Sequence, residues 1–363
     1  MTTATTTIDP AAPRRAEPAR AERAGPRFEW TMVALSAALV AGAHLDSWAH
    51  GHVITTLETF FTPWHAVLYA SLAATLCFLV LNAAWTGARL RDWPHALPDG
   101  YALSLAGCIL FGVGGVLDLA WHLRFGIEVG LQALISPTHL ILIASSGLIV
   151  SGPLRAAWRR PGRRIGWPAL ASATLTLTML TFFAQFDHPF TSQWAASPQP
   201  ALPAEAAEEL GVLGVILQTG LLMGVVLVLL RRFDLPFGSL TLLMGVNAAF
   251  VTMIRGADPV ILVGVIGGLA ADVLVKVLRP GPDRLAQLRL FAFLVPTLTY
   301  ALYFRGLTAA DGVWWPVHLW AGAAVVAGLV GLVLSLAVVP SPTPGERSTL
   351  ASALPPAGAA APR

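Results

Sequence analysis

Long apolar stretches dominate this chain of 363 residues, and they restrict what it can fold into. Each stretch holds about 17–24 residues, the length that a helix needs to cross a ~30 Å hydrocarbon core. Of all residues, 55% are hydrophobic and 12% are charged, a balance that excludes an ordinary soluble domain. The stretches cover residues 29–50, 63–85, 101–122, 137–154, 167–186, 209–230, 237–254, 259–278, 289–305 and 316–339. We therefore expect an all-α fold, a polytopic membrane helical bundle with about ten transmembrane helices.

Lysine and arginine are concentrated in every second connecting segment and in the two ends of the chain. The exceptions are Arg124, Arg255 and Arg305. Basic residues favour the cytoplasmic side of a membrane protein, so this pattern predicts a multi-pass protein of the cell membrane with both termini in the cytoplasm. The lipid bilayer is the expected partner, and no feature of the sequence indicates binding to nucleic acid.

The two ends of the chain differ from the apolar part between them. Residues 1–27 are rich in Ala, Pro, Arg and Thr and lack an apolar core, and residues 340–363 are rich in Pro and Ala. Such composition is typical of disordered segments rather than of a signal peptide. We expect two disordered cytoplasmic tails around a transmembrane domain at 28–339.

A pattern of polar residues occurs twice among the apolar stretches: Asp-x-x-x-His at the end of one stretch, then Pro-x-His at the start of the next. The first copy is Asp46, His50 and His65, and the second is Asp118, His122 and His139. The two Asp residues are 72 positions apart and the last two His residues 74. Each copy spans a two-helix unit, about 29–85 and 101–154, so the units form a parallel repeat. Both polar sets then face the extracytoplasmic side.

The spacing predicts a three-ligand set in each copy. Asp and His at i and i+4 share one face of a helix, in its last turn, where the helix dipole favours a cation. Thr62-Pro63 and Ser136-Pro137 resemble helix starts, with a hydroxyl cap followed by proline at the first position. The histidine that follows lies at the positive end of its helix, which keeps the imidazole neutral. One carboxylate and two neutral imidazoles suit Cu, Zn, Fe or Ni.

Other polar residues extend these sets as candidate additional ligands. His52 is either a ligand or exposed to solvent. Glu58 and Glu128 are ligands, hydrogen-bond partners of ligands, or the polar faces of short interfacial helices. His188 and His318 are candidates to complete or bridge the sites.

Two alternative hypotheses explain the same residues without a metal. Asp–His hydrogen bonds tie neighbouring membrane helices together in many proteins, and chains of His and acidic residues relay protons. Neither reading needs any ligand beyond the protein itself.

The second copy reads Asp118-x-x-Trp121-His122, followed by Ser136-Pro137-Thr138-His139. These segments resemble the C subunit of the particulate methane and ammonia monooxygenases, which has Asp-x-x-x-His with Trp before the His, and a Pro-containing segment with His at the next helix start. The resemblance covers the motif segments and not the whole chain. It implies copper bound by Asp118, His122 and His139 and, by internal repetition, by the first copy. It also implies other membrane subunits or a periplasmic metal donor as partners.

The sequence thus predicts an integral membrane protein with Asp/His/His transition-metal sites. Copper is the expected metal, with zinc and iron as alternatives, and a monooxygenase-like oxidoreductase is the expected activity. A metal transporter or delivery protein, a zinc-dependent membrane hydrolase, and a haem or quinone protein are the alternatives. Transport would need polar groups that lead to the cytoplasmic side, for which Asn247 and Asp272 are the candidates.

Overall fold

The computed structural model describes residues 24–53, 62–126, 130–198, 201–254, 260–310 and 312–341. Within these ranges the chain is helical and contains no β-strand, which confirms the predicted fold class. The α-helices are α1 (Pro26–His52), α2 (Pro63–Trp85), α3 (Trp93–Ala96), α4 (Ala102–Phe125), α5 (Leu131–Ile135), α6 (Pro137–Val150), α7 (Gly152–Trp158), α8 (Trp167–Phe183), α9 (Pro189–Ser192), α10 (Ala204–Arg232), α11 (Ser239–Met253), α12 (Ile261–Leu278), α13 (Leu285–Ala310) and α14 (Val317–Val338). Two 3-10 turns, η1 (Leu90–Asp92) and η2 (Gln185–Asp187), complete the order.

Each predicted apolar stretch corresponds to a helix, but the count of ten membrane crossings is not confirmed. Among the described residues, seven helices are long and apolar enough to cross a bilayer. Together α6 and α7 would add an eighth, although they are bent by 49° at their junction. Helices α8 and α11 have 17 and 15 residues, and a helix of 15 residues is only about 22 Å long. Within the described ranges, length and composition thus support seven crossings, or eight if the bent pair is one span.

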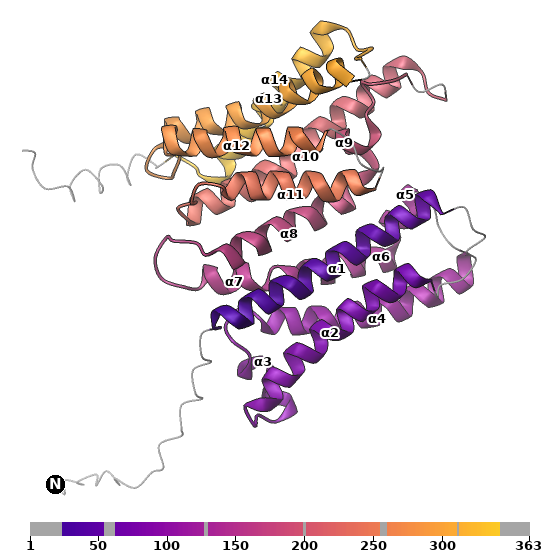
Figure 1. The fold of residues 1–363 in the computed structure, drawn as a ribbon, viewed down its shortest axis with the longest axis vertical. Coiled ribbons are helices and arrows are strands. Elements are labelled where there is room, and N and C mark those ends of the chain that lie inside the picture. The colour runs from indigo at the N-terminus through magenta and orange to yellow at the C-terminus, as the bar shows by residue number, and fades with distance from the viewer. Residues whose placement is uncertain are drawn as a thin grey trace, which may run out of the picture.

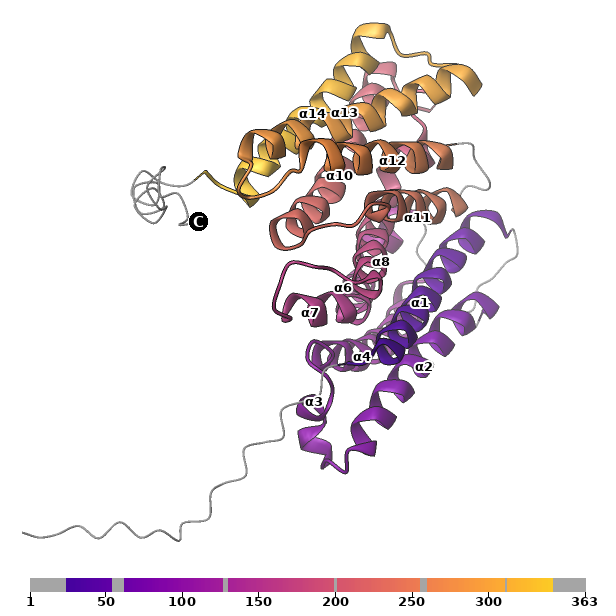
Figure 2. The same cartoon turned by 60° about the vertical axis from the view of Figure 1, so that its left-hand side comes forward.

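Helix α8 lies between two groups of helices (Figures 1 and 2). On one side are α1, α2, α4 and α6, in which α1 packs on α2 and α4 packs on α6. On the other side are α10 to α14, where the closest pairs are α11 with α12 and α13 with α14. The helices of each predicted repeat unit therefore pack against each other. This pairing does not by itself establish the repeat, which stays a prediction.

The two ends of the bundle differ in their charged residues. At the end where α1 begins, Arg160 pairs with Glu29, and Arg163 donates to Asp234 over 2.9 Å. The guanidinium of Arg231 donates to the carbonyl of Val338, 3.2 Å away, so α14 ends where α1 begins. We call this the basic end and the opposite one, where α1 ends, the histidine end. The predicted tails lie almost wholly outside the described residues, although α1 already includes Pro26.

Candidate metal centre

The first cluster joins the end of α1 to the start of α2. One carboxylate oxygen of Asp46, Oδ2, lies 3.8 Å from Nε2 of His50 and 3.5 Å from Nε2 of His65. The other oxygen, Oδ1, is buried and has no hydrogen-bond partner among the described residues. The side chain of His50 is 43% exposed, and those of Asp46 and His65 are 18% and 16% exposed. The cluster is therefore open to one side, through His50.

The start of α2 orients His65. Pro63 occupies the first turn and Thr62 precedes it, and the hydroxyl of Thr62 accepts a hydrogen bond from the backbone N–H of His65 at 3.1 Å. This confirms the predicted cap. The same hydroxyl lies 3.2 Å from Nδ1 of His65. With Nδ1 against the hydroxyl, Nε2 faces Asp46 on the neighbouring helix, and such an outer contact fixes the orientation of a ligating ring.

The second cluster joins the end of α4 to the start of α6 and is more deeply buried. Asp118 is 2% exposed. Its Oδ2 lies 3.3 Å from Nε2 of His122, and its Oδ1 lies 3.4 Å from Nδ1 of His139. Thr138 donates a hydrogen bond of 2.7 Å to Oδ1. The carboxylate is therefore held from two helices at once.

The ring of His122 carries the clearest chemical signal in either cluster. Its Nδ1 lies 3.1 Å from the carbonyl oxygen of Gly126. A carbonyl only accepts hydrogen bonds, so Nδ1 holds a proton, and a neutral ring then presents the lone pair of Nε2. That lone pair faces the anionic Oδ2 of Asp118. Two electron-rich atoms at 3.3 Å need a cation between them, which is either a proton or a metal ion.

The side chain of Ser136 contacts the ring of His139 and does not cap the backbone of α6. Its Oγ lies 2.7 Å from Nδ1 of His139, and no capping bond to a backbone N–H is present. The prediction that Ser136 caps α6 is therefore wrong for its side chain, although Pro137 does stand in the first turn. The hydroxyl is engaged by the imidazole three residues on, a local contact that competes with capping.

The two clusters lie close enough to influence each other. Asp46 interacts electrostatically with Asp118 and His139. Tyr69, on α2, interacts with the charges of both Asp residues, and its ring centre lies 6.3 Å from that of His65. Sequence reasoning did not single out Tyr69, although its position four residues after His65 places it on the same helix face. In each cluster the three ligand atoms lie within 4.8 Å of one another.

Thr138 was likewise not predicted as a functional residue on its own. It lies between Pro137 and His139, so the hydroxyl next to the histidine was a visible signal. The first copy has Trp64 at this position, and the indole Nε1 of Trp64 is buried without a hydrogen-bond partner among the described residues.

The other predicted ligands do not join the clusters where the structure describes them. His52 is exposed, and its ring stacks on Trp48 at 5.1 Å. His318 is exposed at the start of α14, in the other helix group. Glu58 and Glu128 lie outside the described residues.

His188 is buried at the start of α9, where it has a structural role. Its Nδ1 accepts a hydrogen bond of 3.0 Å from the backbone N–H of Phe190. Burial lowers the pKa of His188 to about 3, so the ring is neutral at physiological pH. Burial also raises the pKa of the neighbouring Asp187 to about 6, against a hydrogen bond from Trp194 that lowers it. A capping role explains His188 without any metal.

Comparisons with known protein families, curated proteins and solved structures find no match for this chain. The chain is an integral membrane helical protein that carries two Asp/His/His clusters, each with the donor chemistry and spacing of a metal site.

Proposed function

We propose that this protein is a copper-binding membrane oxidoreductase that holds its metal in the two Asp/His/His clusters on the extracytoplasmic side. The observation that carries the proposal is the contact between Nε2 of His122 and Oδ2 of Asp118, at 3.3 Å, with the Nδ1 proton already committed to Gly126. Two such electron-rich donors, with a second imidazole beside them, form a set that suits copper.

The surrounding residues support a site that is built to hold a metal. Gly126, Ser136 and Thr138 each contact one donor group of the second cluster and fix its direction. Outer contacts of this kind orient ligands, and the carbonyl of Gly126, which accepts from Nδ1–H of His122, also raises the basicity of Nε2. In the first cluster, the buried Oδ1 of Asp46 lacks a partner among the described residues, and a bound cation would satisfy it. When bound, copper supplies one-electron redox chemistry.

The extracytoplasmic location follows from the distribution of basic residues. The arginine contacts described above lie at the basic end, and the clusters lie at the opposite end. Under the positive-inside rule the basic end is cytoplasmic. The clusters then receive their metal and substrate from the other side or from the membrane itself.

Among the described residues, the two polar groups predicted for a transport path, Asp272 and Asn247, both make contacts between helices. The carboxylate of Asp272 accepts hydrogen bonds from the backbone N–H groups of Leu240 and Thr241, at 3.0 and 2.9 Å. The carboxylate of Asp272 therefore caps the N-terminus of α11. Asn247 accepts a hydrogen bond of 2.6 Å from Thr181. Both candidates for a transport path are thus engaged in helix packing.

Metal analysis of the detergent-purified protein tests the proposal. Protein produced with copper supplied is expected to hold copper in a stoichiometric ratio, with a Cu(II) signal in electron paramagnetic resonance. His122→Ala and His139→Ala are expected to lower the copper content, whereas His95→Ala, an exposed histidine near the basic end, leaves it unchanged. Stoichiometric zinc in place of copper would support a hydrolase instead. Absence of any bound metal, or equal content in all variants, would overturn the proposal.

A further inference from the structure

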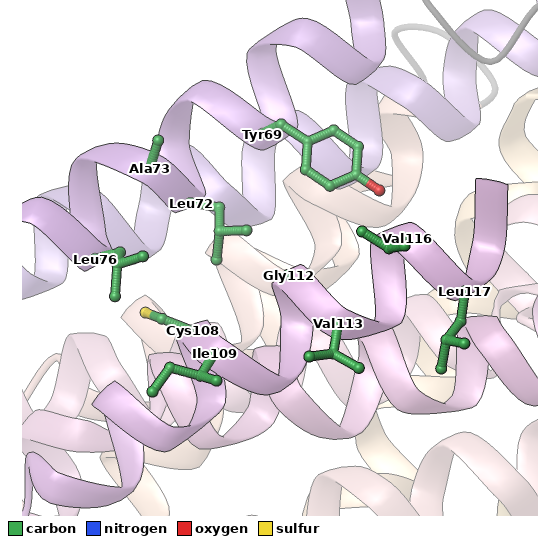
Figure 3. A pocket seen from close by; sticks show the side chains of 10 residues that line it. All are labelled: Tyr69, Leu72, Ala73, Leu76, Cys108, Ile109, Gly112, Val113, Val116 and Leu117. Atoms are coloured by element: carbon green, nitrogen blue, oxygen red, sulfur yellow. The ribbon is translucent and has the colours of Figure 1, made fainter. Parts of the chain in front are cut away.

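An apolar groove of about 580 Å³ runs between α2 and α4. Figure 3 shows Tyr69 at one end of this groove and Cys108 at the other, with Leu72 and Gly112 between them. From Tyr69 to Leu76 along α2 the groove is about 10 Å long, by the rise of 1.5 Å per residue. On its α4 side, Val113 is 50% exposed, so the groove opens toward the lipid-facing surface.

The groove has one polar end, and that end adjoins the metal clusters. Tyr69 carries the only side-chain oxygen among the residues that line it. The same phenol interacts with the charges of Asp46 and Asp118. A molecule with its polar end at Tyr69 would therefore have its apolar part in the groove and its head next to both clusters.

Packing at Tyr69 restricts what can enter. A Cβ atom added to Gly115 would lie 2.6 Å from the phenol oxygen, so the ring of Tyr69 fits closely against α4 at this level. The close contact narrows the histidine end of the groove. The groove is open instead along its lipid-facing side, past the half-exposed Val113.

We propose that the groove between α2 and α4 binds a single-chain lipophilic molecule with one small polar end, such as a medium-chain alcohol, and presents that end at Tyr69 to the Asp/His/His clusters. The role of this molecule as substrate rests on the proposed function, but its binding does not. The wall of the groove is aliphatic, which suits an alkyl chain, and the phenol both donates and accepts hydrogen bonds, which suits a hydroxyl.

Gly112 offers a way to fill the groove without disturbing the fold. A Cβ atom added there meets no other atom within 4 Å. Gly112→Leu is therefore expected to fold and to occupy the space of the ligand. Gly147, on α6, is also a half-buried helical glycine with no atom within 4 Å of an added Cβ. Gly147→Leu is the matched control because it makes the same change outside the groove.

The experiment uses the full-length protein in phosphatidylcholine nanodiscs and a decanol analogue with a photoreactive diazirine. Labelling is expected to be saturable, to map to peptides of α2 and α4, and to be displaced by 1-decanol. Leu at position 112 would occupy the space of the alkyl chain, so Gly112→Leu is expected to abolish saturable labelling. Gly147→Leu is expected to behave like the parent protein. Tyr69→Phe is expected to weaken displacement by 1-decanol but not by decane.

Metal analysis of the same samples separates the two proposals. Saturable labelling without bound metal would support the groove and overturn the proposed function. Bound metal with labelling that does not saturate, or that spreads over the other lipid-facing helices, would overturn the groove alone. An equal effect of both leucine variants would also contradict it.

Discussion

The two Asp/His/His clusters share their three donor residues and differ in what surrounds them. In the second cluster, Thr138 donates a hydrogen bond to the buried carboxylate of Asp118. In the first, the corresponding residue is Trp64, and Oδ1 of Asp46 has no partner among the described residues. One substitution, next to the proline of each copy, therefore changes how the carboxylate is held.

The two clusters also differ in burial, and the second cluster is again the one whose carboxylate is more enclosed by protein. The side chain of Asp118 is 3% exposed, and that of Asp46 is 18% exposed. Electrostatic interactions are stronger where water is excluded, and a preoriented ligand loses less entropy on binding. A repeated ligand pattern therefore does not give the two clusters equal surroundings. We expect the second cluster to bind metal more tightly than the first.

The largest effect is expected when a carboxylate ligand is neutralised. Asp118→Asn removes the anionic donor of the buried cluster, and affinity for copper there is expected to fall more than the ~10–100-fold that loss of an outer partner costs. Asp46→Asn is the matched change in the first cluster and is expected to affect the weaker site. Competition titrations with a copper chelator measure both. If Asp46→Asn removed the tighter-bound ion, the ranking of the clusters would be reversed.

Thr138→Val tests the residue that distinguishes the two copies. It keeps the shape of the side chain and removes the hydroxyl that Asp118 accepts from, so copper affinity at the second cluster is expected to fall about 10–100-fold. The reverse change, Trp64→Thr, supplies a hydroxyl near Asp46 and is expected to strengthen the first cluster. Unchanged affinity in Thr138→Val would show that the hydrogen bond does not determine the difference.

A pH titration of stability tests the burial of His188. Since burial lowers the pKa of His188 to about 3, the folded protein favours the neutral ring, and the unfolded chain takes up a proton first as the pH falls. The contribution of His188 to the stability of metal-free protein is therefore expected to be complete above pH ~6.5 and to fall below it, by up to about 1.4 kcal/mol per pH unit. Thermal unfolding in detergent with a chelator present measures this dependence.

His188→Asn serves as the variant for that titration because Asn also caps helices and does not titrate. It is expected to flatten the decline and to leave the copper content unchanged. Asp187 acts in the opposite direction: its pKa of about 6 means that stability from this carboxyl is lost as the pH rises toward 6. Asp187→Asn is therefore expected to steepen the decline that His188 causes. If stability declined with falling pH as steeply in His188→Asn as in the parent protein, His188 would not be the group that causes the decline.

The smallest effect is expected from the two hydroxyls that precede the prolines. Thr62 caps α2 and contacts His65, whereas Ser136 contacts His139 without capping α6. Thr62→Ala is therefore expected to cost about 1 kcal/mol of stability even in metal-free protein. Ser136→Ala is expected to show its effect in copper binding instead. Equal losses of stability in metal-free protein would contradict this distinction.

Local features of this protein can be predicted from its sequence. Apolar stretches of bilayer length predicted the helices, because each helix satisfies its own backbone hydrogen bonds and needs no partner to do so. Asp46 with His50 and Asp118 with His122 are one helical turn apart, a spacing that the 3.6-residue period fixes. Proline and the preceding hydroxyl residue likewise marked the start of α2 and α6.

The tertiary structure sets every contact that depends on the approach of different helices. It joined His65 to Asp46 and His139 to Asp118, and it left His318 in the other helix group. Histidines at the ends of membrane helices look alike in sequence, and packing alone selects which of them meet a carboxylate. The fit of Tyr69 against Gly115 is a contact of this kind. No local pattern encodes it, because it depends on how two helices far apart in the sequence settle against each other.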